Sequence, residues 1–147
     1  MANIIPYSFR GALFSGQHDF AAGGNAFNLS LYVTNPYSTA STVYLAGTGN
    51  GEVDPGGTSN YVVKTLANQA VASTTAVASV DFDNVTWSSA TFTSSFAAIY
   101  NNSTVDGTQN RLVVVLDFGG AKTATNGDFT IVFPDASTPA NAIISMA

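Results

Sequence analysis

The sequence contains no cysteine, and histidine occurs only once, at His18. The absence of cysteine excludes a disulfide framework and thiolate metal sites, so the folded chain depends on packing, backbone pairing and partners. One histidine also leaves too few nitrogen ligands for the usual zinc sites. The length of 147 residues suits one hydrophobic core, and we expect a single domain over residues 1–147.

Charged residues are scarce as well. Four Lys and Arg and nine Asp and Glu make up 9% of the chain, with a formal net charge of -5, whereas charged residues form about a quarter of an average soluble domain. The four cations are too few to neutralise several phosphates, so we expect no nucleic-acid binding. A weakly charged surface also repels its own copies poorly, which favours a protein whose surface is covered in a many-copy assembly.

Long apolar runs are missing. The longest purely aliphatic run, Leu112–Leu116, is far shorter than the roughly 20 residues of a membrane-spanning helix. At the amino terminus, Pro6, Ser8 and Arg10 interrupt the apolar stretch that a secretory signal requires. We therefore expect no membrane association and no secretory route.

The apolar residues that are present alternate with a period of two, which is typical of β-strands. In residues 27–33, every second side chain from Phe27 to Val33 is apolar and the intervening ones are mostly polar. Residues 90–100 and 128–134 alternate in the same way. Residues 112–118 are apolar on both faces, which predicts a central strand covered on both sides.

Gly, Asn and Asp clusters separate these segments. "NNSTVDGTQN" and "GGAKTATNGD" each contain a pair that favours tight turns, so we expect a three-stranded meander from Ala90 to Pro134. Weaker strands are expected at residues 8–14, 42–45, 60–66 and 78–82, and a last one at "AIISM". The sequence predicts an all-β fold: a single-domain antiparallel β-sandwich or a jelly-roll-like barrel.

No group of residues indicates a reaction centre. His18 lies beside Asp19 and close to Ser15, but neighbours in sequence do not form a catalytic triad, and we interpret them as a polar loop cluster. Four aspartates at strand ends or turns fit backbone capping better than a hydrolase pair or a calcium site: Asp81, Asp83, Asp117 and Asp128. Trp87 fits a core anchor better than a residue that stacks on a sugar or base. We expect no enzyme, no catalytic residue, no cofactor and no metal.

Three segments carry a resemblance to a known family. "FDNVTWSSATFTSSFAAIYNN", "NRLVVVLDFGGAKTATNGDFTIVFP" and "NAIISMA" closely resemble, in order and spacing, the carboxyl-terminal half of a widespread family of small structural proteins of tailed bacteriophages. The likeness covers Asp81 to Ala147. Upstream, "FNLSLYVTN" and "GEVDPGGTSNYVVKTL" resemble the family more loosely, and the Gly-Tyr usual in its loop is replaced here by Ser59-Asn60-Tyr61.

The resemblance implies a virion component without an active site. Asp83 and Asp117 would then brace turns, and Trp87, Phe118, Phe129 and Phe133 would fill the core. The expected function is that of a capsid decoration or cement protein, on the outer surface of the virion. It would be made in the host cytoplasm, would bind the phage major capsid protein, and would form a homo-oligomer, with a trimer favoured. A tail, neck or receptor-binding virion component is the alternative.

Two segments are the expected contact elements, because their composition suggests that they order only on docking. They are an extended amino-terminal arm over residues 1–9 and the glycine-rich loop Gly47–Gly57. The expected interface residues in them are Ile4, Ile5, Tyr7, Phe9, Asn50, Glu52 and Asp54.

Overall fold

The computed structural model describes residues 2–74, 76–134, 138 and 142–146. These residues form two antiparallel sheets and one short α-helix, so the all-β prediction is confirmed. The first sheet has the strand order β2-β1-β5-β6, and the second has the order β3-β4-β7. The elements are α1 (Tyr7–Phe14), β1 (Phe27–Tyr32), η1 (Thr48–Asn50), β2 (Lys64–Thr65), β3 (Ala70–Ser73), β4 (Ala78–Asp81), β5 (Val85–Asn101), β6 (Arg111–Ile131) and β7 (Ile144–Met146).

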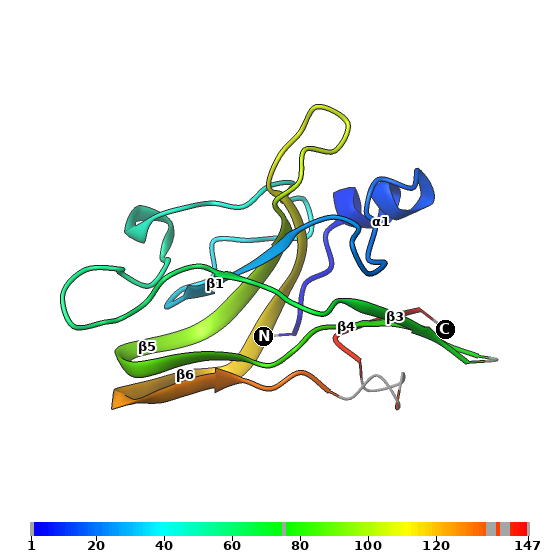
Figure 1. Ribbon diagram of the computed structural model, residues 1–147. Helices are drawn as coiled ribbons and strands as arrows, with labels where there is room; N and C mark the ends of the chain where they lie inside the picture. Colours follow the sequence, from blue (N-terminus) through cyan, green and yellow to red (C-terminus); the bar gives the residue numbers. More distant parts are fainter. Residues whose placement is uncertain (1, 75, 135–137, 139–141, 147) are drawn as a thin grey trace.

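The long pair of strands β5 and β6 organises the molecule. The end of β5 near Asn101 pairs with β1 as well as with β6, whereas the half that begins at Val85 pairs only with β6. Figure 1 shows this two-stranded ribbon curling around one side of the molecule, so that its lower half runs toward β4 beneath the layer that contains β1. The arrangement is sandwich-like, with two separate sheets, and it is not a closed barrel.

The main core lies inside this curl. Its buried side chains come from α1, from both sheets and from the loops between them. Trp87 is 1% exposed, contacts the rings of Phe92 and Phe129, and donates its indole N–H to the Val62 carbonyl at 2.7 Å. The prediction that Trp87 anchors the core is therefore confirmed. Phe129 and Phe133 are buried in the same core, and Phe118 packs against it while half-buried.

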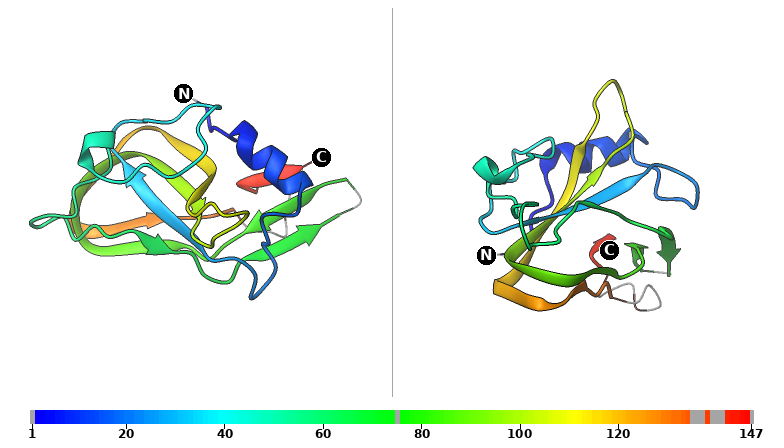
Figure 2. Two further views of the ribbon diagram at one scale, coloured as in Figure 1. Left: turned by 90° about the horizontal axis from the view of Figure 1, so that it is seen from above. Right: turned by 60° about the vertical axis from the view of Figure 1, so that its left-hand side comes forward.

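The expected strand over residues 8–14 is wrong, because these residues form helix α1. Phe9, Ala12 and Leu13 are spaced by three and four positions, which places them on one side of a helix, and that side packs on the core. Pro6 precedes the helix with an extended backbone. The helix lies alongside β7 in Figure 2, above the second sheet.

The expected three-stranded meander is also wrong. Residues 119–128 do not form a hairpin connection, because β6 continues through them as one strand of 21 residues. Gly119 and Gly120 have φ values of 70° and 138°, and Asn126 has a φ of 48°. These residues bend and bulge the strand instead of reversing it. The register with β5 shifts between Ser94 and Phe96, opposite Gly119 and Gly120, and between Ala90 and Phe92, opposite Asn126.

The remaining strand predictions hold in part. The strand at residues 27–33 is observed as β1, residues 78–82 as β4 and the last segment as β7. Only Lys64–Thr65 of residues 60–66 is a strand, and residues 42–45 contribute one bridge, Val43 to Arg111. Residues Leu112–Val115 are buried on both faces as expected, at 0–2% exposure. However, β6 is an edge strand, and Val43 and Ile4 cover its outer side at Arg111 and Val115.

Candidate functional site

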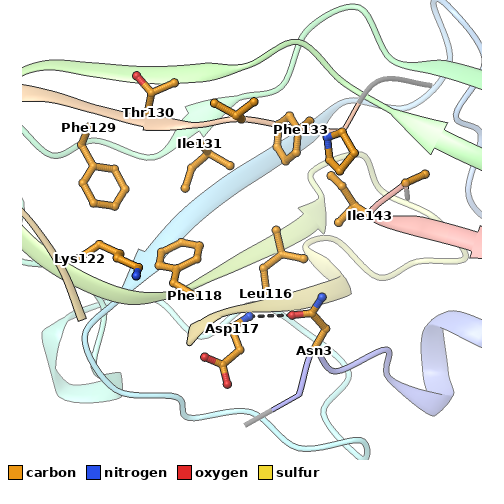
Figure 3. Close-up of a pocket in the computed structure, with 13 residues that line it drawn as sticks. Asn3, Leu116, Asp117, Phe118, Lys122, Phe129, Thr130, Ile131, Phe133 and Ile143 are labelled. Atoms are coloured by element: carbon orange, nitrogen blue, oxygen red, sulfur yellow. Dashed lines mark hydrogen bonds between the residues drawn. The ribbon is translucent and has the colours of Figure 1, made fainter. Parts of the chain in front are cut away.

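A groove lies along the outer side of β6, and we call it the β6 groove. It has a volume of about 620 Å³. Its apolar lining comes from both halves of the bent strand and from described residues that follow it, and includes Leu116, Phe118, Phe129, Ile131, Phe133 and Ile143. Asn3, Asp117 and Lys122 add polar groups (Figure 3), so the described lining includes a cation and a carboxylate.

The bend in β6 creates this groove. Gly119 and Gly120 turn the strand, so the segment Leu116–Phe118 and the segment 129–133 lie on opposite sides of the same hollow. The last three residues of β6, 129–131, and the three that follow it, 132–134, line it, although neighbouring side chains of a strand point to opposite faces. The groove therefore runs along the edge of the strand. Between residues 119 and 131, none of the described strands pairs with that edge.

The amino-terminal segment closes one side of the groove. The backbone N–H and C=O of Ile4 bond to Val115 at 2.8 and 2.9 Å, and the Asn3 side-chain oxygen accepts the N–H of Asp117 at 2.9 Å (Figure 3). The expectation of an extended arm over residues 1–9 is therefore wrong for residues 2–9. Ile4 pairs with β6, and helix α1 begins at Tyr7. Met1 lies outside the described residues.

The expected interface residues fall into three groups by exposure. Phe9 is 1% exposed in the core and Glu52 is 8% exposed, so both side chains contact their own chain and neither is at the surface. Ile4 and Ile5 are half-buried, whereas Tyr7, Asn50 and Asp54 are exposed. The exposed residues lie in α1 and in the glycine-rich loop, and their role as contacts stays a prediction.

Glu52 is the best-satisfied charged group among the described residues. Its carboxylate accepts hydrogen bonds from the Tyr61 hydroxyl at 2.7 Å, from the Tyr44 hydroxyl at 2.9 and 3.0 Å, and from the Gly47 backbone N–H at 2.6 Å. Val53, which follows, is 2% exposed and bonds to Leu31 of β1. The start of the glycine-rich loop is therefore fixed, contrary to the expectation that the whole loop is unstructured.

Burial raises the pKa of Tyr61 and Tyr44 above its ordinary value, and the hydrogen bonds to Glu52 raise it further. Burial also raises the pKa of Tyr32, whose hydroxyl donates to the Leu45 carbonyl at 2.8 Å. These hydroxyls therefore remain protonated at neutral pH. The cluster gives three donors to one carboxylate, which is the pattern of a structural clasp.

Backbone capping is observed for two of the four aspartates for which it was predicted, Asp81 and Asp117. Asp117 and Asp128 lie within β6 and not at a strand end or a turn between strands. Asp117 Oδ1 accepts the Gly119 N–H at 2.8 Å at the start of the bend, and Asp81 Oδ1 accepts the Phe82 N–H at 2.8 Å. Asp83 Oδ2 accepts from the Asn68 side chain at 2.6 Å. Among the described residues, no three His, Asp or Glu side chains are placed to hold a metal ion. His18 lies in the loop between α1 and β1 and makes a polar contact with Asn101, but at 8% exposure it is buried.

Sequence reasoning missed the β6 groove and the role of Glu52. The groove depends on the bend in β6, and the sequence there is equally typical of a hairpin turn. The clasp brings together Tyr44, Glu52 and Tyr61, which come into contact only because the glycine-rich loop packs on the sheet. The one available signal was a lone Glu followed by Val in a loop of glycines. None of the described helices is long and apolar enough to cross a membrane.

Comparisons with known proteins give no relative. No family model matches the chain, and no curated protein and no solved structure is significantly similar to it.

Proposed function

We propose that this chain is a structural protein of a tailed-bacteriophage virion, specifically a capsid decoration or cement protein that binds the major capsid protein and stabilises the head. The observation that carries the binding part of the proposal is the β6 groove. Its lining includes the half-buried Leu116, Phe118 and Ile143, and it meets the edge of β6 at Lys122 and residues 129–131. None of the described strands pairs with that edge between residues 119 and 131. Such an edge binds extended segments of other proteins by adding a strand.

The composition supports a protein partner over a nucleic acid or a charged ligand. Only 9% of the residues are charged, and among the described residues that line the groove Lys122 and Asp117 are the charged ones. Val132, which also lines the groove, is 70% exposed. An apolar surface of this kind is stabilised when another protein covers it.

The proposed location in a virion, on its capsid, is based on the sequence resemblance. The segments that carry it, from Asp81 to Ala147, include β5, β6 and β7, and these strands supply the groove and much of the core. In this proposal the protein sits on the outer capsid surface as a homo-oligomer, with a trimer favoured, after synthesis in the host cytoplasm. It performs no catalysis and requires no cofactor.

Binding to capsids tests the proposal. Purified protein is mixed with undecorated heads of the encoding phage and sedimented. Val132→Lys places a charge on the groove rim, and Val62→Lys is the matched control, because Val62 is 56% exposed and does not line the groove. We expect wild type and Val62→Lys to co-sediment with heads. The affinity of Val132→Lys for heads should be lower by about tenfold or more.

Two results would change the account. If wild-type protein does not sediment with heads, the capsid assignment fails and the tail, neck or receptor-binding alternative replaces it. If wild type binds and both variants bind equally well, the protein is a decoration protein that does not use the groove.

A further inference from the structure

His18 is a buried titratable group that the proposed function does not use. It lies between α1 and β1, is 8% exposed, and has its ring 5.0 Å from that of Phe9 and 6.2 Å from that of Phe20. Its Nδ1 lies 3.0 Å from the side-chain nitrogen of Asn101, the last residue of β5. Its Nε2 is buried and has no hydrogen-bond partner in the described part of the chain.

The neighbouring amides fix the protonation state of the ring. The Ser103 backbone N–H, which can only donate, bonds to Asn101 Oδ1 at 2.9 Å, so the other end of that amide is the Nδ2 donor. Asn101 Nδ2 also donates to Asn25 Oδ1 at 2.9 Å, and the Asp19 backbone N–H donates to the same oxygen at 2.9 Å. His18 Nδ1 must therefore accept from Asn101, and the neutral ring carries its hydrogen on Nε2.

Protonation of Nδ1 is incompatible with this arrangement. The new N–H would point at the N–H groups of Asn101. If the side-chain amide of Asn101 or Asn25 flipped, its oxygen would no longer accept the hydrogen bond from the Ser103 or the Asp19 backbone N–H. A charged ring would also be buried without a partner. Burial first, and then the charge of Arg111, lower the pKa of His18 from 6.5 to about 4.

The charged groups around the ring do not compensate. From β6 comes Arg111, whose guanidinium lies 3.8 Å from the carboxylate of Asp106 in the β5–β6 connection. Asp19, in the segment of His18 itself, accepts the Ala21 N–H with its Oδ1 at 2.9 Å. Helix α1 contacts the ring with the uncharged side chain of Phe9.

We propose that His18 is an acid-sensitive latch that holds helix α1 and residues 15–25 against the end of β5, and that its protonation releases them while the sheets remain folded. Few backbone hydrogen bonds among the described residues connect α1 to the loop that follows β1. One of them joins the Tyr7 N–H to the Thr39 carbonyl at 2.9 Å. Release would uncover Phe9 and Phe20, which line an apolar groove of about 140 Å³ between α1 and the second sheet.

Hydrogen–deuterium exchange of the full chain tests the latch, with exchange rates corrected for their intrinsic dependence on pH. The matched variant is His18→Gln, whose amide oxygen can accept from Asn101 and does not titrate. In wild type, we expect the opening constant of peptides within residues 7–25 to rise about tenfold or more as the pH falls from about 6.5 to about 4. In His18→Gln it should change less than about twofold, and β5 should remain protected in both proteins.

Equal pH dependence in the two proteins, or loss of β5 protection in parallel with residues 7–25, would overturn the latch. A second measurement does not depend on how the variant folds. Because the chain has one histidine, ring nitrogen NMR shifts of the wild-type protein report on His18 alone. We expect the Nε2–H tautomer and no titration near the ordinary histidine pKa, and an Nδ1–H tautomer or a titration at about 6.5 would contradict the proposal.

Discussion

At the scale of single residues, Glu52 shows how a buried charge is tolerated without a cation. Its two oxygens accept from Tyr44, Tyr61 and the Gly47 N–H, so hydrogen bonds replace the lost hydration. The Tyr61 hydroxyl also accepts the Leu31 N–H at 3.0 Å, which connects the clasp to β1. Glu52 therefore fixes the first part of the glycine-rich loop on the sheet.

Replacing this carboxylate should destabilise the fold. In Glu52→Gln one oxygen becomes an NH₂ group that faces hydroxyl or backbone donors, so we expect the free energy of unfolding to fall by about 2–3 kcal/mol. Asp54→Asn is the control, because Asp54 is exposed and its Oδ1 can still accept the Gly56 N–H as an amide oxygen; we expect a change within about 0.5 kcal/mol. Urea denaturation measures both values. Equal stability of wild type and Glu52→Gln would show that the clasp contributes nothing.

At the scale of the elements, the bend in β6 determines where the groove lies. Gly120 has a φ of 138°, a backbone angle that residues other than glycine rarely adopt. A Cβ at this position would meet no atom within 4 Å. The requirement for glycine is therefore one of backbone conformation and not of space.

Gly120→Val should strain the bend and cost about 1–3 kcal/mol of unfolding free energy. Gly127→Ala in the same strand is the control, because its φ lies outside the positive range and a Cβ there would make only an ordinary contact at 3.7 Å. Thermal unfolding compares the two variants. If both lose the same stability, the conformation of Gly120 is not what limits the substitution.

The elements also show what the sequence could predict. The alternation that marked β1 and the second half of β5 is a local property, and it identified the all-β class. The apolar periodicity around Trp87 likewise indicated its core position. Helix α1 was missed because a segment of eight residues is too short for period two and period 3.6 to be separated. The β6 groove could not be predicted, because Gly119, Gly120 and Asn126 favour a hairpin turn and a strand bend equally well.

At the scale of the whole molecule, stability should depend on protonated tyrosines. Burial raises the pKa of Tyr32, Tyr44 and Tyr61 above the ordinary value of 10, so the folded state prefers the protonated form more strongly than the unfolded state does. Their contribution to stability is complete below about pH 10 and is lost as the pH rises above it.

We therefore expect the urea midpoint to be constant from about pH 8 to about pH 9.5 and to fall steeply toward about pH 11. In Tyr44→Phe one titrating hydroxyl is removed, and the fall should be shallower. Tyrosinate absorbance recorded on the same samples should rise together with unfolding. A midpoint that does not change up to about pH 11 would mean that these hydroxyls ionise freely in the folded protein.

The central claim is that the protein covers a phage capsid, and its copy number in the virion tests this most directly. Particles of the encoding phage are purified, and quantitative mass spectrometry gives the ratio of this chain to the major capsid protein. A decoration protein should be present in hundreds of copies per particle, in a fixed ratio to the capsid subunit. A count of tens or fewer would contradict capsid decoration and place the protein in the tail or neck, and its absence from particles would contradict a virion role altogether.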